Sequence, residues 1–336
     1  MRLASLIICL LALAGATCPA RLLAAGNPER ITYDAPSYAH YGAFRSGTSQ
    51  PGKAVATLWL PDKPAPDIST GDKLPAVVIG HSIGGWKDSS EGRYVQPLLA
   101  AGFAVIGLDH FSGRGITRAA DVPGAISPMT PVSDALLALK LVASHPRIDP
   151  RRIGVMGLSM GGVTAELTAY ELVRRRVLGD SDLKFAAHLP FYAPCGNVFI
   201  NNNGPTLTGA PMLKLYAGRD ETTPRDKCDR IEALLAASQP GLDRRAIWYP
   251  DAYHAWEVPT APRFYPQHVN ARKCPITDFG SSLRLIDANG GERPYDLAEI
   301  QACIRDSTGY SMGASPAAAA DAMKQMLAFF ARTLGK

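Results

Sequence analysis

Short apolar runs alternate along the chain with longer segments whose apolar residues recur at helical spacing. The short runs predict strands at 54–60, 76–80, 103–108, 152–156, 185–192, 212–216 and 246–249. The longer segments predict helices at 92–101, 131–144, 160–175, 228–237 and 316–334. Strands that alternate with helices in this way indicate an α/β fold, with a mostly parallel central sheet and helices on both faces.

The start of the chain departs from this rhythm. Met1–Arg2 gives a short positive start, and residues 3–16 are almost uninterruptedly apolar. Small residues at 14–16 and 24–25 offer cleavage sites, so residues 1–25 have the layout of a secretory signal peptide. A membrane-spanning helix needs about 20 apolar residues, and this run is shorter. An uncleaved membrane anchor is the alternative.

Cysteine usage supports export. Two of the six cysteines lie in the leader, and four remain in the mature chain: Cys195, Cys228, Cys274 and Cys303. Cys18 of the leader leaves lipid attachment as an alternative. An even number in an exported protein indicates two disulfides, for which three connectivities exist. We favour Cys195–Cys228 and Cys274–Cys303, because each pair closes a local loop. Zinc is a poor alternative, because no C-x-x-C or H-x-x-x-H spacing accompanies them.

The alternation of strands and helices breaks again at about 262–315. This segment is rich in Gly, Pro and charge and holds the second cysteine pair. We interpret it as an excursion, pinned by a disulfide and bordering the active site, within one domain over 26–336; a small separate domain is the alternative. About 310 residues are enough for one large α/β domain.

The charge of the chain is mild. The full sequence has 35 Lys and Arg against 30 Asp and Glu, a net charge of +5 that falls to +3 when residues 1–25 are removed. The cations are scattered, with no basic stripe interleaved with aromatic residues, so nucleic acid is not an expected partner. No stable membrane insertion is expected once the leader is gone.

The sequence Gly157-Leu158-Ser159-Met160-Gly161 stands between a predicted strand and a predicted helix. In that context G-x-S-x-G is typical of a nucleophile elbow, a turn so tight that small residues must flank the serine. Such a turn raises the hydroxyl above the sheet and directs the free N–H groups of the helix toward the reaction. An ordinary strand-to-helix turn is the alternative interpretation.

A serine nucleophile needs a base, and the base needs a group that orients it. Of the downstream histidines, His254 is the best base, because it follows the last predicted strand at the catalytic end of a parallel sheet. His188 falls inside a strand, and His268 falls in the excursion. Asp220, directly after the strand at 212–216, is the candidate acid. Glu221 and Asp251 are its competitors.

The oxyanion hole is expected to combine the backbone N–H of Met160 with one from the loop 81–86. Within that loop we favour the N–H of Ile83, with Ser82 as its competitor, and assign His81 to loop structure. Trp86 either lines a substrate pocket or belongs to the core. Arg114, in the loop after the strand at 103–108, either binds a substrate carboxylate or holds its loop through the backbone or Asp109.

These motifs together resemble the dienelactone hydrolase family of the α/β-hydrolase superfamily. The resemblance runs in family order over roughly residues 54–256 and is carried by 80–85, Asp109 with 114–115, 153–162, 218–220 with Pro224, and 253–256. It implies an α/β-hydrolase sheet and a triad of Ser159, Asp220 and His254. The enzymes that name the family have a cysteine at the elbow and are compact and intracellular. This chain, with its serine, leader and excursion, is closer in character to the exported serine members.

The expected function is that of a periplasmic or secreted serine hydrolase acting on a small-molecule carboxylic ester or lactone through an acyl-enzyme. No metal or organic cofactor is implied. The alternatives are a peptidase or amidase on the same fold and a non-catalytic exported binding protein. The prolyl peptidases of the superfamily usually carry a propeller or another large accessory domain, and no such repeat is present.

Overall fold

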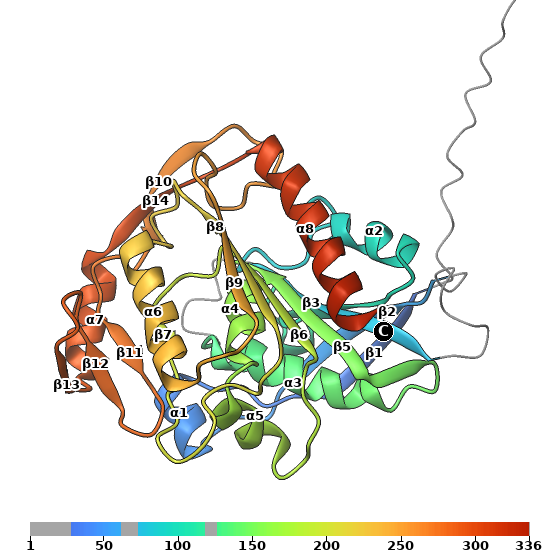
Figure 1. The fold of residues 1–336 in the computed structure, drawn as a ribbon, viewed down its shortest axis with the longest axis horizontal. Helices are drawn as coiled ribbons and strands as arrows, with labels where there is room; N and C mark the ends of the chain where they lie inside the picture. The colour runs from blue at the N-terminus through green and yellow to red at the C-terminus, as the bar shows by residue number, and fades with distance from the viewer. Residues whose placement is uncertain (1–27, 62–72, 118–125, 336) are drawn as a thin grey trace, which may run out of the picture.

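The computed structural model describes residues 28–61, 73–117 and 126–335. The expected leader, residues 1–25, lies outside them. An eight-stranded sheet forms the centre of the molecule, in the order β1-β2-β4-β3-β5-β6-β8-β9 (Figure 1). All neighbours from β4 to β9 pair in parallel, and β2 pairs antiparallel with both β1 and β4. The strands are β1 (Glu29–Asp34), β2 (Lys53–Trp59), β3 (Leu74–Gly80), β4 (Ala104–Asp109), β5 (Ile148–Leu158), β6 (Ala187–Phe191), β8 (Met212–Ala217) and β9 (Arg244–Tyr249).

Helices cover both faces of this sheet, which confirms the α/β class expected from the sequence. α2 and α8 pack on one face, and α3, α4, α5 and α6 pack on the other (Figure 1). Successive residues of β3 enter opposite cores, Val77 with α8 and Val78 with α3, so this strand is apolar throughout. No helix within the described ranges is long and apolar enough to cross a membrane. The helices are α1 (Tyr41–Ser46), η1 (Gly92–Tyr94), α2 (Val95–Ala100), η2 (Ser112–Arg114), α3 (Met129–Ala143), α4 (Met160–Leu167), α5 (Glu171–Leu178), α6 (Arg225–Ser238), α7 (Leu297–Asp306) and α8 (Pro316–Leu334).

The helix predicted at 160–175 is instead two helices, α4 and α5. The break is tertiary in origin. Glu171 N–H donates to the carbonyl of Thr206, and Thr208 N–H donates to the carbonyl of Ala169, so a neighbouring loop takes the place of helical partners. The Thr168 hydroxyl also donates to the carbonyl of Ala165, three residues earlier.

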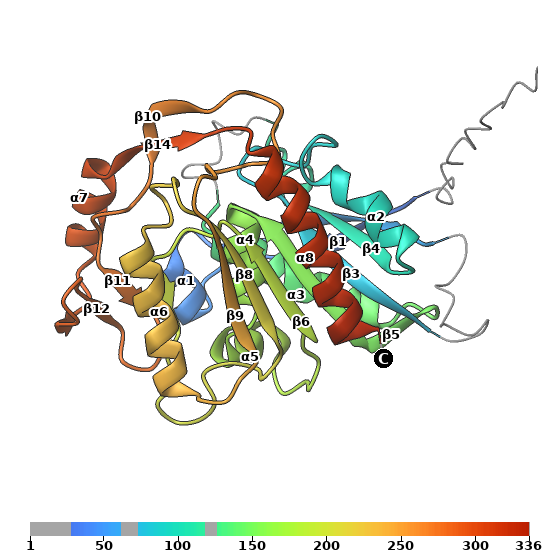
Figure 2. The same ribbon diagram turned by 45° about the horizontal axis from the view of Figure 1, so that its top comes forward.

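The excursion after residue 261 contains regular structure that the sequence did not indicate. β10 (Arg263–Val269) pairs with β14 (Thr308–Met312), and β11 (Ile276–Asp278), β12 (Arg284–Ile286) and β13 (Glu292–Pro294) form a small sheet. That sheet continues onto β7 (Asn197–Val198) of the main body. In Figure 2 the excursion runs in orange to red beside α6, and β10 and β14 lead back toward α8.

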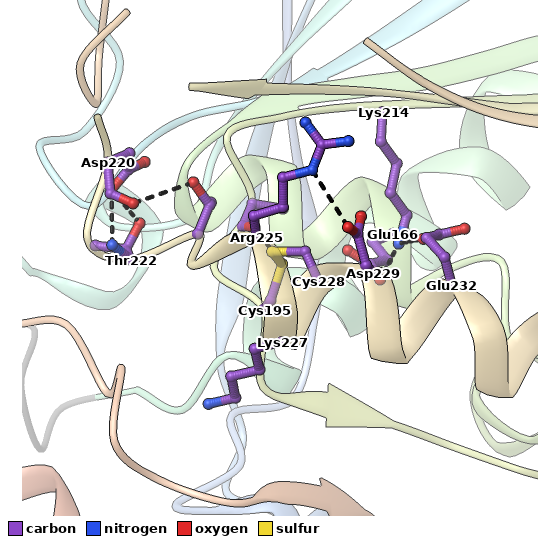
Figure 3. The surroundings of a disulfide bond; sticks show 12 residues. Glu166, Cys195, Lys214, Asp220, Thr222, Arg225, Lys227, Cys228, Asp229 and Glu232 are labelled. Carbon is purple, nitrogen blue, oxygen red and sulfur yellow. Dashed lines mark hydrogen bonds and ion pairs between the residues drawn. A yellow bond between two sulfur atoms is a disulfide. The ribbon is translucent and has the colours of Figure 1, made fainter. Parts of the chain in front are cut away.

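The structure contains both of the disulfides that the sequence favoured. Cys195–Cys228 joins the loop after β6 to α6 (Figure 3). Cys274–Cys303 joins the start of the small sheet to α7. Beside the first bond, Lys214 of β8 lies buried, with its Nζ 2.7 Å from Glu166 Oε1 and 2.6 Å from Glu232 Oε1 (Figure 3). These ion pairs connect the helices α4 and α6 to the strand β8.

Candidate active site

Ser159 occupies the sharp turn between β5 and α4. Its backbone has a φ of +55° and a ψ of −109°, a strained conformation for a residue with a side chain. The glycines on either side are sterically required. A Cβ on Gly157 would lie 2.2 Å from the carbonyl oxygen of Gly161, and one on Gly161 would lie 2.1 Å from that of Gly80. The local sequence therefore forces the serine out at the carboxyl end of the sheet.

Three side chains, from the loops after β5, β8 and β9, meet at this point. Ser159 Oγ lies 2.9 Å from His254 Nε2, and His254 Nδ1 lies 2.6 Å from Asp220 Oδ2. The backbone N–H and the hydroxyl of Thr222 both donate to Asp220 Oδ1, at 2.8 and 2.7 Å, which fixes the carboxylate. Because Asp220 accepts at Nδ1, the free lone pair of the imidazole faces the serine hydroxyl.

The competing candidates lie elsewhere. Glu221 accepts a hydrogen bond from the Ser311 N–H at 2.8 Å, and the exposed Asp251 pairs with Arg219. His188 is buried in the core, with Nδ1 2.9 Å from the carbonyl of Ala165. His268 lies on β10 against the ring of Tyr265.

The loop 81–86 is held by a buried acid that carries no sequence signal. Glu91 is fully buried; its Oε1 accepts from the N–H of Ser82 at 2.9 Å and its Oε2 from the N–H of Lys87 at 3.1 Å. The N–H of Ser82 is thereby engaged. Within the part of the chain that the structure describes, the N–H groups of Ile83 and Met160 donate to no protein acceptor. Both are thus available to a ligand.

His81 supports the same loop from below. It is buried, its Nε2 accepts from the N–H of His110 at 3.1 Å, and burial lowers its pKa to about 3, so the ring is neutral. This agrees with the structural role expected from the sequence.

Arg114 is not available to a substrate, contrary to one of its two predicted roles. Its guanidinium is buried and binds both carboxylate oxygens of Asp134, at 2.8 and 2.9 Å. The remaining donors go to Ser37 and to backbone carbonyls, among them that of Ala35. All five N–H groups are thereby used. Arg114 does hold its loop, but through Asp134 rather than Asp109.

Trp86 is partly buried and stacks on Trp59, with 5.8 Å between the ring centroids. Its ring also packs over Gly107, where a Cβ would approach it to 2.6 Å. These contacts place Trp86 at the edge of the hydrophobic core. A role in substrate binding stays a prediction.

The excursion borders the histidine directly. Gly313 N–H donates to the carbonyl of His254 at 3.0 Å, and the ring of Tyr310 lies edge-on to the imidazole at 5.1 Å. Tyr192, at 4.8 Å, packs against the same ring. Burial, and then the nearby Asp220, raise the pKa of Tyr310 to about 12, so its hydroxyl keeps its proton. Neither tyrosine carries a sequence signal, since the contacts arise from chain segments far apart.

The chain is similar to several known proteins. An uncharacterized protein of Pseudomonas aeruginosa is 30% identical over 119 residues, which are 35% of this chain and 30% of that protein. YtaP of Bacillus subtilis is 26% identical over 206 residues, 51% of this chain and 69% of that protein. A dienelactone hydrolase-like promiscuous phosphotriesterase from metagenomic libraries has the same fold, with a TM-score of 0.52 and 12% identity over 91% of this chain and 99% of that one.

The match to a family is more extensive than these pairwise matches. The sequence pattern of the dienelactone hydrolase family covers residues 65–334, which include every strand from β3 to β14 and all helices from α2 to α8. The family is one of hydrolases, and its fold is the one described above. The chain belongs to the dienelactone hydrolase family.

Proposed function

We propose that this hydrolase cleaves carboxylic esters or lactones with Ser159 as nucleophile, His254 as base and Asp220 as the group that orients the base. The observation that carries the proposal is the continuous hydrogen-bonded sequence from Ser159 Oγ through His254 to Asp220. In addition, the N–H of Met160, the residue after Ser159, and the N–H of Ile83 have no protein acceptor in the described part of the chain. A nucleophile, a base and oxyanion donors are the set that acyl transfer requires.

The reaction follows from this geometry. His254 Nε2 takes the proton of Ser159 as Oγ attacks the ester carbonyl, and the N–H groups of Met160 and Ile83 donate to the oxyanion that forms. When the ester C–O bond breaks, His254 gives its proton to the leaving alcohol. Water then attacks the acyl-enzyme, loses its proton to His254, and releases the acid and Ser159. In a lactone the leaving alcohol stays attached to the acyl group.

Asp220 accepts from the protonated Nδ1 throughout. It keeps Nε2 as the reactive nitrogen and stabilises the positive charge that the ring carries between the two proton transfers. The rings of Tyr310 and Tyr192 both pack against the imidazole and limit its rotation.

We also propose that the protein acts outside the cytoplasm, in the periplasm or as a secreted protein, after removal of residues 1–25. Two disulfides support an oxidising compartment. The rest of the chain, 26–336, would then act as one hydrolase domain with its excursion at about 262–315.

The test is hydrolysis of nitrophenyl esters from acetate to decanoate, of a lactone, and of an aminoacyl anilide. The purified protein is compared with Ser159→Ala, and both are treated with a fluorophosphonate probe. Ester or lactone turnover and labelling, both lost in Ser159→Ala, are expected. Preferred turnover of the anilide would indicate an amidase instead. If the wild-type protein neither turned over any of these substrates nor reacted with the probe, the proposal would be refuted.

A further inference from the structure

A cavity of about 680 Å³ lies between the first turn of α6 and the excursion. None of its lining residues belongs to the proposed triad. The lining comes from α6, from the residues around Cys274, and from β12, β13 and α7 of the excursion. This volume is in the range of pockets that bind small organic molecules.

Lys227 is the most unusual group in this lining. Its side chain is only 8% exposed, yet Nζ makes one hydrogen bond, to the backbone carbonyl of Ala271 at 3.1 Å. No carboxylate within the described ranges lies in ion-pair distance of it. In Figure 3 the side chain extends from α6 away from the ion pairs of Lys214. Burial lowers the pKa of Lys227 to about 8, a sign that the ammonium lacks sufficient partners.

The lining of the cavity carries more positive charge than negative charge. Arg293 is neutralised by ion pairs with Asp287 and Glu299. Three further cations of the lining, Arg230, Arg272 and Lys273, form no ion pair with a described carboxylate. Asp226 is the remaining acid, and it is exposed.

The other part of the lining is apolar. Ile276 and Ile286 face each other across the paired strands β11 and β12, and the disulfide Cys274–Cys303 lies beside them. A ligand that fits such a cavity therefore has an anionic end and an apolar body.

We propose that this cavity is a binding site for a small organic anion, with its carboxylate or phosphate group on Lys227 and its apolar body against Ile276 and Ile286. An anion in this position accepts from the two N–H groups of Lys227 that have no acceptor among the described residues, and it offsets the excess of positive charge. A neutral analogue offers neither benefit, because burying an unpaired ammonium is unfavourable. The site is separate from Ser159.

The test is calorimetric titration of the full mature protein with benzoate and with phenyl phosphate, with benzyl alcohol as the neutral probe. We expect at least one anion to bind, and Lys227→Met to weaken that binding at least tenfold. Arg225→Met, on the same helix but outside the lining, removes an equal charge and is expected to leave affinity within about twofold. Binding of benzoate alone identifies a carboxylate ligand, and binding of phenyl phosphate alone a phosphate ligand.

Three outcomes would overturn the proposal: no binding of either anion, equal binding by Lys227→Met, or loss of binding in Ser159→Ala, which would place the anion in the active site. A second measurement needs no variant at Lys227. In the wild-type protein, the bound anion is expected to slow acetylation of Lys227 by acetic anhydride, as read by mass spectrometry. The exposed Lys324 of α8 serves as the internal control. Unchanged acetylation of Lys227 at saturating anion would also refute the site.

Discussion

The buried carboxylate of Glu91 offers the sharpest test of how the oxyanion hole is built. Glu91 accepts from the N–H groups of Ser82 and Lys87, which stand on either side of Ile83 in sequence. Glu91→Gln keeps one acceptor oxygen and replaces the other with an NH₂ group, so one of the two backbone N–H groups loses its partner. A hydrogen bond to a charged group contributes about 1.5–3 kcal/mol.

If that energy is what holds the Ile83 N–H in position, its loss reduces kcat by about 10- to 100-fold, at about 1.4 kcal/mol per tenfold. KM is expected to change little, because the oxyanion contact strengthens only in the transition state. Steady-state hydrolysis of nitrophenyl acetate measures both constants, with urea unfolding to verify that the variant is folded.

Asp88→Asn is the matched control for Glu91→Gln. It removes a carboxylate from an exposed position in the same loop, and no hydrogen bond to the N–H groups of Ser82 or Lys87 involves Asp88. Its kcat is expected to stay within about twofold of wild type. A folded Glu91→Gln protein with wild-type kcat would show that the loop keeps its shape without this carboxylate.

Three further predictions follow from buried groups. Asp220→Asn is expected to lower kcat for nitrophenyl esters by roughly 10⁴-fold, and a loss under tenfold would assign the acid to another residue. Lys214→Met leaves Glu166 buried without its ion pair, so urea unfolding should show a loss of about 3–5 kcal/mol; an unchanged midpoint would contradict the ion pair. Burial raises the pKa of Glu257 above 4.5, so this group favours the folded state less as pH rises past 4.5. Glu257→Gln should therefore gain stability relative to wild type as the pH rises above 4.5, measured by urea unfolding at each pH, and a constant difference would refute the shift.

The parts of the site that the sequence predicted are those that local sterics encode. Ser159 could be located because a turn this tight excludes side chains at Gly157 and Gly161, and that exclusion leaves a pattern of glycines. Asp220 could be located because it follows the buried strand β8, and His254 because it lies in the loop after β9, the last strand of the predicted parallel series. Parallel strands end at the same edge, so sequence order alone brings the loops after them together.

The parts that the sequence did not predict depend on contacts between distant segments. β1 is an edge strand whose residues are mostly exposed, so it lacks the apolar run that revealed the others. Glu91 gives no signal because its function lies in two backbone N–H groups that it meets only in the folded loop. The role of Arg114 was left open for the same reason, since Asp134 lies on a helix whose position the sequence does not fix.

The excursion is the clearest case of structure that exists only in context. β11 has three residues and could not be stable alone, but it pairs with β7 of the main body and with β12. Elsewhere in the excursion, β14 pairs with β10 and holds the ring of Tyr310 edge-on to His254, while β11 and β12 form one wall of the cavity around Lys227. The proposed anion site and the proposed active site are thus both bordered by the excursion, although they share no catalytic residue.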